Sequence, residues 1–278
     1  MAFNFADKEK DKNNLMVVDA LNLAFRWKHA KKTNFVEEYI RTVQSLAHSY
    51  NCSEVLITAD QGSSAYRKQV YPEYKQNRKD KYETQTEVEK EAFLAFFEEY
   101  ERTLQELEKY YPVFRFQGVE ADDLAAYIVQ NRPKYKTDHI WLISSDRDWD
   151  LLVGENVSRF SYVTRKEITY QNWAEHYDVP MENYLDYKVL IGDSGDNIPG
   201  IDGIGPVRAK ALIEEYGTAL DILDAVPIAG KYKYIQKINE QAHEVIERNY
   251  YLMDLVTFSE DAIGVENAAQ VLKKLESL

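Results

Sequence analysis

Leu15-Met16-Val17-Val18-Asp19 is a short apolar run closed by an acid, the pattern of a strand buried in a parallel sheet. A second run of this kind, from Glu54 to Asp60, also ends in an aspartate. Further strand-like and helical patterns alternate along the chain: strands at 111–116, 139–144 and 157–162, and helices at 35–49, 93–107 and 120–130. This alternation predicts an α/β fold with a mostly parallel central sheet flanked by helices.

Carboxylates follow the ends of the predicted strands, and parallel sheets bind ligands beyond the carboxyl ends of their strands. Five segments carry these acids: Asp19; Asp60; Glu120, Asp122 and Asp123; Asp146 and Asp148; and Asp193 and Asp196. Hard divalent cations such as Mg²⁺ prefer oxygen ligands. A surplus of carboxylates is what a two-metal enzyme that cleaves phosphodiesters needs. The pattern therefore predicts a divalent-metal centre.

Each acidic cluster taken alone has an ordinary structural explanation. Glu120, Asp122 and Asp123 open a helix, where carboxylates complement the helix dipole. Asp146 and Asp148 follow a strand and could form an Asx turn. Single aspartates at strand ends are common. The metal-centre hypothesis rests on the convergence of these segments rather than on any one of them.

Composition places the chain of 278 residues among globular proteins, with 45% apolar and 29% charged residues. The single cysteine, Cys52, excludes an intrachain disulfide and a thiolate zinc cluster, and the five histidines are scattered. No apolar run approaches the roughly 20 residues that span a bilayer. The polar segment 1–14 lacks the apolar core of a signal peptide. We therefore expect a cytoplasmic protein with a solvated tail at 1–14.

The net charge of −13 argues at first sight against a nucleic-acid partner. Bound divalent ions would offset several of the carboxylates, however, and basic residues gather in two stretches, 26–32 and 67–81. The segment from Tyr71 to Tyr82 interleaves cations with tyrosines, a pattern that suits a single strand through base stacking and phosphate contacts. A solvated loop is the ordinary alternative for such a charge run.

The segment from Ile191 to Gly205, Ile-Gly-Asp-Ser-Gly-Asp-Asn-Ile-Pro-Gly-Ile-Asp-Gly-Ile-Gly, is the most specific pattern in the chain. Its later glycines permit a tight hairpin, and a helix follows from Pro206 to Tyr216. The backbone N–H groups of such a hairpin, with the helix N-terminus, can hold a phosphate without reading a base. Two basic residues of the helix would add contacts to the DNA backbone: Arg208 and Lys210. A plain loop-to-helix turn is the alternative.

Together these motifs resemble the flap endonuclease (5′-nuclease) superfamily, particularly the small bacteriophage 5′-to-3′ exonucleases. The 5′-nuclease domains of bacterial DNA polymerase I look like more distant relatives. The resemblance runs from about 14 to at least 217, and Gly192 to Gly200 with the glycine hairpin is its most specific part. It implies a PIN/5′-nuclease-like core at 15–186 with a helical arch at about 71–109. A helical DNA-binding region would follow at 187–278, with a helix-hairpin-helix at about 190–216.

The resemblance also implies roles for single residues. The first metal would be held by Asp19, Asp60, Glu120, Asp122 and Asp123. The second would be served by Asp146, Asp148, Asp193 and Asp196. Lys75 and Arg78 match the active-site lysine and arginine at the base of the arch, and Tyr74 matches its stacking tyrosine. Further DNA contacts are expected from Arg26, Lys79, Lys81, Lys188, Gly200, Gly203, Gly205, Arg208 and Lys210.

Departures from the family pattern are small. Arg147 stands where phage relatives usually have glycine. Ala59-Asp60-Gln61 replaces a more usual Gly-Asp-Lys or Phe-Asp-Gly, which keeps the acid but removes a cation. The stretch from about Asp221 matches weakly, so the resemblance leaves its contacts undefined.

The function that the resemblance implies is a structure-specific 5′ nuclease, both 5′-to-3′ exonuclease and flap endonuclease, of DNA replication or repair. It would use two or more Mg²⁺ ions, with Mn²⁺ as a substitute and K⁺ at the helix-hairpin-helix, and leave 5′-phosphate and 3′-hydroxyl ends. The expected partners are branched or 5′-ended DNA and replication proteins. We expect the protein to be a monomer and to have no membrane partner. If a phage encodes it, we expect it in the cytoplasm of the bacterial host.

Other functions fit parts of the sequence. A non-catalytic protein that binds branched DNA would share the hairpin and the basic stretch, but it would have no reason to keep all of the acids. A Mg²⁺ phosphohydrolase that acts on small phosphate esters would not need the hairpin or the arch. A PIN-type ribonuclease would share the sheet and the strand-end acids, typically in a shorter chain without the hairpin.

Overall fold

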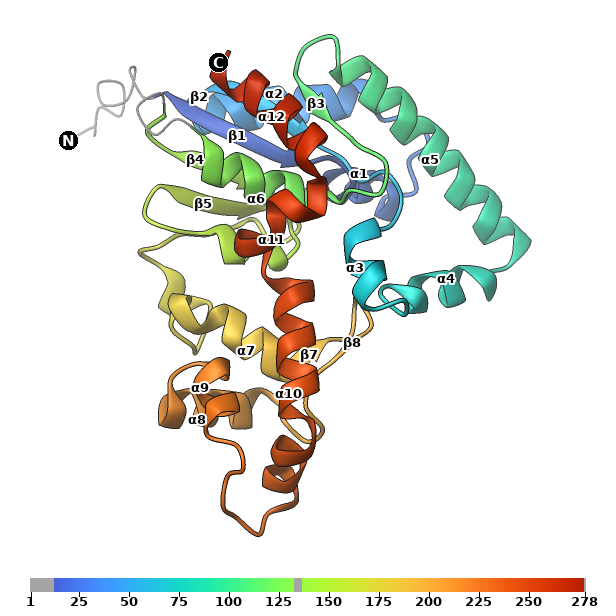
Figure 1. Ribbon diagram of the computed structural model, residues 1–278. Coiled ribbons are helices and arrows are strands. Elements are labelled where there is room, and N and C mark those ends of the chain that lie inside the picture. The colour runs from blue at the N-terminus through green and yellow to red at the C-terminus, as the bar shows by residue number, and fades with distance from the viewer. Residues whose placement is uncertain (1–12, 133–136, 278) are drawn as a thin grey trace, which may run out of the picture.

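The computed structural model describes residues 13–132 and 137–277, so the expected tail at 1–14 lies almost wholly outside the described residues. Within these ranges the centre is a six-stranded sheet in the order β3-β2-β1-β4-β5-β6 (Figure 1). Its strands are β1 (Asn14–Asp19), β2 (Cys52–Thr58), β3 (Val113–Phe114), β4 (Ile140–Ile143), β5 (Val157–Ser161) and β6 (Lys166–Ile168). The pairs among β1 to β5 are parallel, and only β6, which the sequence pattern did not indicate, pairs antiparallel. The predicted mostly parallel sheet is confirmed.

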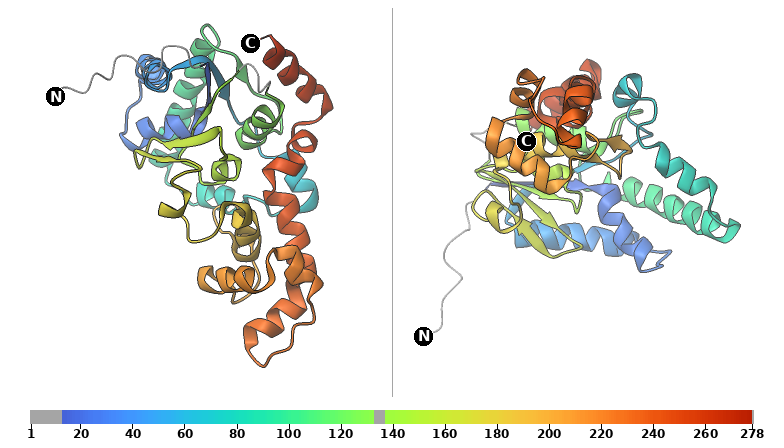
Figure 2. Two further views of the ribbon diagram at one scale, coloured as in Figure 1. Left: turned by 90° about the vertical axis from the view of Figure 1, so that its left-hand side faces the viewer. Right: turned by 90° about the horizontal axis from the view of Figure 1, so that it is seen from below.

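The central strand β1 is buried on both faces, as its continuous apolar pattern predicts. Leu15 and Val17 share a core cluster with α6 (Ala121–Asn131), α11 (Leu255–Ile263) and α12 (Val265–Glu276). Met16 and Val18 belong to the opposite cluster, with α1 (Ala20–His29), α2 (Val36–Ser49) and α5 (Glu87–Leu107). Figures 1 and 2 show these helical layers on the two faces of the sheet. Because side chains alternate across a strand, one short run fills two cores.

The end of the chain differs from the prediction that 187–278 is one helical DNA-binding region. The helix α10 (Lys233–Met253) leads back toward the sheet, and α11 and α12 then pack on α6. Their apolar residues Leu255, Ile263 and Val271 share the core cluster of the central strand. The last helices therefore complete the sheet domain, as the red end of the ribbon in Figure 1 shows. An amphipathic helix pattern does not identify the surface on which the helix packs, so the sequence could not show this return.

A helical body with a core cluster of its own follows the sheet domain. It contains α7 (Tyr184–Ile191), α8 (Pro206–Tyr216), α9 (Ala219–Asp224) and the first part of α10. Short 3-10 helices precede it at Asp148–Leu152, Trp173–Glu175 and Met181–Asn183. Between α7 and α8, β7 (Gly192–Asp193) and β8 (Ile198–Pro199) form a short antiparallel hairpin. The helical region predicted after 187 therefore also contains a pair of short strands.

The β7–β8 hairpin requires glycine at two positions. Gly192 has a φ of 75°, and a Cβ placed on it would lie 2.3 Å from the backbone nitrogen of Gly200. A Cβ on Gly200 would lie 2.3 Å from the carbonyl carbon of Ile191. Only glycine permits so close a backbone approach. The loop that carries Asp193 and Asp196 therefore folds back against the end of α7.

The predicted arch is formed by helices that project from the sheet domain. The helix α3 (Ala65–Val70) leads to α4 (Gln76–Glu83), which has no buried residue, and α5 runs from the outer end of α4 back to the sheet domain at an angle to α4 (Figure 1). The C-terminal half of α5 does not project, because Phe96, Tyr100 and Leu104 are buried in the sheet domain. The projecting part is therefore shorter than the expected range of 71–109.

Candidate metal centre

The carboxyl-end edge of the sheet carries the first acids. Asp19 ends β1 and caps α1, where its Oδ1 accepts a hydrogen bond from the Asn22 N–H at 3.1 Å. Its Oδ2 accepts from the Ser144 hydroxyl at 2.8 Å, which ties the ends of β1 and β4 together. Asp60 follows β2, and its Oδ1 accepts from the Ala121 N–H at 2.7 Å. These acids lie where the strand order reverses at β1, the place where open α/β sheets bind ligands.

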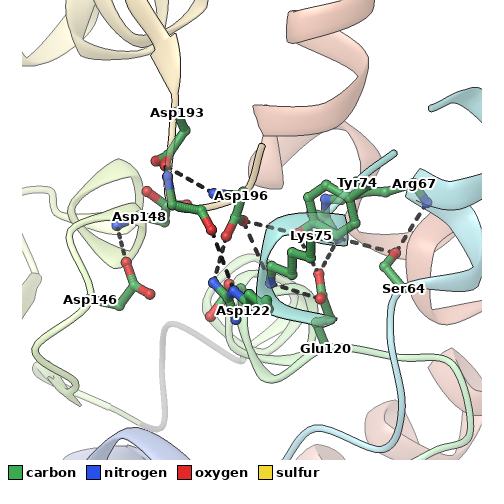
Figure 3. Close-up of polar contacts among 12 residues, drawn as sticks. Ser64, Arg67, Tyr74, Lys75, Glu120, Asp122, Asp146, Asp148, Asp193 and Asp196 are labelled. Atoms are coloured by element: carbon green, nitrogen blue, oxygen red, sulfur yellow. Dashed lines mark hydrogen bonds and ion pairs between the residues drawn. The ribbon is translucent and has the colours of Figure 1, made fainter. Parts of the chain in front are cut away.

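The N-terminus of α6 supplies Glu120 and Asp122 (Figure 3). Glu120 Oε1 accepts from the Lys75 ammonium at 2.8 Å, and its Oε2 accepts from the Tyr74 hydroxyl at 2.9 Å. Asp122 Oδ1 accepts from the Trp149 indole N–H at 2.5 Å. The start of α6 thus meets the foot of the arch on one side and the 3-10 helix after β4 on the other.

Asp123 lies one residue further along α6 and points elsewhere. Its two oxygens accept from the two terminal nitrogens of Arg67 at 2.7 Å each, and only 1% of the residue is exposed. Arg67 is itself buried and also donates to the Leu252 carbonyl at 2.7 Å. In this geometry a guanidinium takes both Asp123 oxygens, and the role of Asp123 as a ligand of the first metal stays a prediction. Successive helix residues are rotated by about 100°, which separates Asp123 from Asp122.

The second set of acids comes from two loops, shown together in Figure 3. Asp146 and Asp148 follow β4, and Asp146 Oδ1 accepts from the Asp148 N–H at 3.0 Å. Asp146 and Asp148 therefore form the Asx turn that was the structural alternative to a metal site for this pair. Asp193 and Asp196 lie in the β7–β8 hairpin, where Asp193 Oδ1 accepts from the Gly195 N–H at 2.8 Å.

Two cations of the arch lie between the two sets of acids. The Lys75 ammonium is 2.8 Å from Glu120 Oε1 and 3.5 Å from Asp196 Oδ2. The Arg78 guanidinium donates to Asp196 Oδ1 at 2.5 Å. Both residues lie at the foot of the arch, at the start of α4. One ammonium therefore joins an acid of the sheet domain to an acid of the hairpin.

Lys188 and Tyr74 are buried in this structure, and their contacts with DNA stay a prediction. Lys188 is 7% exposed, donates a hydrogen bond to Asp148 and lies 3.2 Å from Asp193. Tyr74 is 2% exposed, and its hydroxyl lies 3.0 Å from Asp196 Oδ2. The Tyr74 ring is thus covered, and the Lys188 ammonium is paired with two carboxylates. Both side chains organise the acids.

The other predicted DNA contacts lie at the surface. The side chains of Arg26, Lys79, Lys81 and Arg208 are exposed, and that of Lys210 is partly exposed. In the glycine hairpin, Gly203 and Gly205 leave the backbone accessible beside α8, whereas Gly200 packs against the end of α7. A groove of about 1290 Å³ runs from the second set of acids to Val207 and Lys210 at the start of α8. The acids and the hairpin are thus connected along one surface.

Burial and crowding raise the pKa of several acids. Burial raises the pKa of Asp19 to about 8, and the charges of Asp60 and Asp146 add to the effect. Burial also raises the pKa of Asp122 well above its usual range, again with a contribution from Asp146. Burial raises the pKa of Asp148 to about 6, although the charge of Lys188 opposes it.

Glu120 shows the opposite shift. Its burial opposes ionisation, but the charges of Lys75 and Arg67 outweigh burial and lower its pKa to about 2. The Lys75 ammonium is buried as well, and Glu120 outweighs that burial and raises the pKa of Lys75 well above its usual range. The pair therefore stays ionised across the physiological range of pH.

The acids fit divalent metal ions by their chemistry. Within 13–132 and 137–277, no three His, Cys, Asp or Glu side chains lie close enough to hold one ion, and acids such as Asp60, Asp122 and Asp148 contact an N–H group or a cation. The donors are hard carboxylate oxygens, which Mg²⁺, Ca²⁺ and Mn²⁺ prefer. Burial is the main cause of the raised pKa values of Asp19 and Asp122, and a divalent cation bound at this edge would stabilise their charged forms.

Several organising residues were missed by sequence reasoning. Arg67 lies in a basic stretch of mostly exposed cations, and nothing in the sequence separates it from them. Asn77 and Asn197 join the arch to the hairpin through their side-chain amides. A signal existed for Asn197, since asparagine in a glycine-rich loop often adopts a left-handed backbone, and its φ is 60°.

Known proteins match both parts of the chain. Residues 14–178 match the family described as 5′-3′ exonuclease, N-terminal resolvase-like domain, and residues 179–276 match 5′-3′ exonuclease, C-terminal SAM fold. The flap endonuclease of Escherichia phage T5 is 44% identical over 255 residues, 91% of this chain and 87% of that protein. DNA polymerase I of Caldicellulosiruptor bescii is 30% identical over 77% of this chain, which spans 24% of the polymerase.

Solved structures agree with these matches. A structure of the T5 5′-exonuclease with divalent zinc ions has a TM-score of 0.91 at 42% identity and covers 95% of this chain and 99% of that one. A T5 flap endonuclease variant in a pseudo-enzyme–product complex with DNA and metal ions also gives 0.91 and 42%, with 95% and 98% coverage. The match extends through the C-terminal helices, beyond the weak similarity expected after 221. This chain therefore belongs to the 5′-3′ exonuclease family and is a structure-specific 5′ nuclease.

Proposed function

We propose that this 5′ nuclease hydrolyses DNA phosphodiesters near single-stranded 5′ ends with two or more Mg²⁺ ions, leaving 5′-phosphate and 3′-hydroxyl ends. The observation that carries the proposal is the position of Lys75, within 2.8 Å of Glu120 and 3.5 Å of Asp196. Its ammonium marks a point where a positive charge contacts both sets of acids at the foot of the arch. A phosphate bound by Lys75 there would lie beside both sets.

The acids divide into two proposed ligand sets. The first ion would be held by Asp19, Asp60, Glu120 and Asp122. The second would be held by Asp146, Asp148, Asp193 and Asp196. Bound divalent ions would supply Lewis-acid polarisation of the phosphate and a water of lowered pKa. Mn²⁺ should substitute for Mg²⁺, because carboxylate oxygens suit both metals.

Lys75 and Arg78 would bind the scissile phosphate and stabilise the charge that grows on it. The raised pKa of Lys75, which Glu120 causes against the effect of burial, keeps its ammonium charged. Lys75 therefore acts as a fixed positive charge rather than as a proton donor that titrates near neutral pH. Fixed charges aimed at the reacting group stabilise the transition state without reorganisation.

The surfaces beside the site support recognition of DNA shape rather than base sequence. The exposed helix α4 and the start of α5 would admit a single-stranded 5′ end, with Lys79 and Lys81 on its phosphates. The glycine hairpin and the start of α8 would hold the adjoining duplex. There the Gly203 carbonyl accepts from the Arg208 guanidinium at 2.6 Å, and K⁺ is proposed to bind carbonyls of the same hairpin.

We also propose an oligomeric state, partners and a location for this protein. Action as a monomer with replication proteins is part of the proposal, and the phage origin of one relative, the flap endonuclease of Escherichia phage T5, supports a bacterial host cytoplasm. No helix in the described ranges is both long and apolar enough to cross a membrane.

The direct test is cleavage of a labelled 5′-flap duplex with Mg²⁺ or EDTA, by the wild type and by Asp148→Asn. The proposal expects flap release near the junction with Mg²⁺, none with EDTA, and loss of cleavage in the variant. Asp261→Asn, an exposed position on α11, is the matched control and should cleave normally. Tight flap binding without cleavage under any divalent metal would contradict the proposal.

Two further substrates separate the alternative activities. A single RNA strand of the flap sequence should be cleaved far more slowly than the DNA flap, because the glycine hairpin needs an adjoining duplex. A chromogenic phosphate ester should not be hydrolysed at a comparable rate. Faster turnover of the RNA strand would favour a ribonuclease, and faster turnover of the ester would favour a small-molecule phosphatase.

A further inference from the structure

We propose that Asn77 and Asn197 are positioning residues that join the foot of the arch to the β7–β8 hairpin, and that the cleavage rate depends on this joint. The inference rests on the proposed role of Lys75 and Arg78 in binding the scissile phosphate. We call the joint the arch clip, defined by the hydrogen bonds of Asn77 and Asn197 across it.

The first half of the arch clip runs from α4 to the hairpin. Asn77 Nδ2 donates to the Ser194 carbonyl at 2.8 Å and lies 3.3 Å from the Gly195 carbonyl. Both acceptors are backbone atoms between the acids Asp193 and Asp196. The contact therefore restrains the path of the hairpin chain rather than a single side chain.

The second half runs from the hairpin back to the arch. Asn197 Nδ2 donates to the Glu73 carbonyl at 2.8 Å, just before α4 begins. Between the two amides, the Lys75 N–H donates to the Asp196 carbonyl at 2.9 Å. The arch and the hairpin are thus linked by side-chain amides in both directions and by one backbone bond.

The backbone at the joint is strained on both sides. Lys75 has a φ of 55° and Asn197 a φ of 60°, in the left-handed region. This region is unfavourable for residues with a Cβ, and asparagine tolerates it better than lysine. A residue stays in such a conformation where its surroundings over-determine it. The arch clip supplies that restraint to Lys75, so loss of the clip lets Lys75 leave its position.

The clip residues act through their neighbours. The ammonium of Lys75 reaches Glu120, and the guanidinium of Arg78 reaches Asp196. The side chains of Asn77 and Asn197 bond backbone carbonyls, not carboxylates. A shift at the joint would therefore move both cations relative to the first set of acids, which the clip does not contact.

Two variants break the joint from opposite sides. Asn197→Gly keeps the left-handed backbone accessible and removes only the amide. Asn77→Ala removes the other amide. The matched control is Gln76→Ala, in the same turn, because Gln76 Nε2 donates to Asp80 at 2.8 Å on the exposed face of α4. Since the two variants act on different elements, one folded variant suffices for the test.

The first measurement is single-turnover cleavage of the 5′-flap duplex at saturating enzyme and Mg²⁺. Each clip variant should cleave about tenfold more slowly or worse, because small misplacements of reacting groups cost up to about 10²-fold. Flap affinity measured with Ca²⁺ should change less than about twofold, and Gln76→Ala should match the wild type. The double variant should lose less than the product of the single losses, because both break one joint.

The second measurement does not depend on catalysis. Amide hydrogen exchange of the metal-free protein should show faster exchange of the Lys75 N–H in both clip variants, with β1 unchanged. Wild-type exchange at Lys75, or faster exchange with an unchanged cleavage rate, would overturn the proposal. Failure of the wild type to cleave flaps would instead contradict the proposed function, and the exchange result would still decide whether the joint exists.

Discussion

The two sets of acids are built in different ways. Asp19, Asp60, Glu120 and Asp122 all come from the sheet domain, at the ends of β1 and β2 and the start of α6. The second set is divided between the loop after β4, which carries Asp146 and Asp148, and the β7–β8 hairpin of the helical body. One sheet therefore places the first set, whereas the packing of two bodies places the second.

The two sets also differ in how their charge is compensated. In the first set the pKa of Asp19 is raised to about 8, chiefly by burial, so this carboxyl holds a proton at neutral pH. In the second set, Lys188 lies between Asp148 and Asp193, and Arg78 pairs with Asp196. A metal ion would therefore displace a proton from Asp19 in the first set, where Glu120 is paired with Lys75, and would displace Lys188 and Arg78 from the second set.

The largest expected effect is on catalysis. Asp122→Asn and Asp146→Asn should each lower single-turnover flap cleavage on the order of 10³-fold, the loss found when a charge-stabilising group is removed from an active site. Binding of branched DNA should be largely intact. Calorimetry with Mn²⁺ should show loss of one site in each variant, a different one in each. Near-normal turnover by either variant would remove that residue from the proposed ligands.

The next effect separates neighbours on α6 by stability. Asp123→Asn should destabilise the metal-free protein by about 3 kcal/mol, because it removes the bidentate charged partner of the buried Arg67, which keeps a single contact with Glu120 at 3.1 Å. Asp122→Asn should raise stability at pH 8, since burial makes the charged form of Asp122 unfavourable. Urea unfolding in EDTA measures both changes. Equal losses in the two variants would show that Asp122 and Asp123 have similar environments.

The third effect is a pH dependence of the metal-free protein. The folded pKa of Asp19, about 8, lies above its usual 3.8, so its contribution to stability is full below about pH 4 and lost as pH rises through 8. The midpoint of thermal unfolding in EDTA should therefore fall across this window. Asp19→Asn should flatten the profile, and saturating Mg²⁺ should do the same in the wild type. A profile unchanged by Asp19→Asn would refute the assignment.

The smallest effect is expected outside both sets. Arg208 is exposed beside the glycine hairpin, so Arg208→Ala should leave single-turnover cleavage at saturation unchanged. Flap affinity should weaken by about tenfold or less, and the slope of log affinity against log salt should become shallower by about 1, as for one lost phosphate contact. A slower chemical step in this variant would contradict the prediction, because it would show that Arg208 affects the cleavage step as well as DNA binding.

Sequence reasoning located the strand-end acids because a parallel sheet forces its carboxyl ends to one edge. It could not separate Asp122 from Asp123, since both fit the start of an acidic helix. The distinction depends on Arg67, which lies far along the chain and is identified only by its burial. The position of Lys188 between Asp148 and Asp193 could not be predicted for the same reason, because a lysine pattern does not reveal which carboxylates surround it.

The sequence by itself determined the mostly parallel sheet, the acids at its edge, the basic foot of the arch and the glycine hairpin, because each depends on local pattern and backbone chemistry. Tertiary structure alone decided which acids face each other, which cations lie between them, and that α11 and α12 close the sheet domain. Those features depend on contacts between segments distant along the chain. Local patterns do not specify such contacts, because burial and charge pairing are properties of the packed molecule.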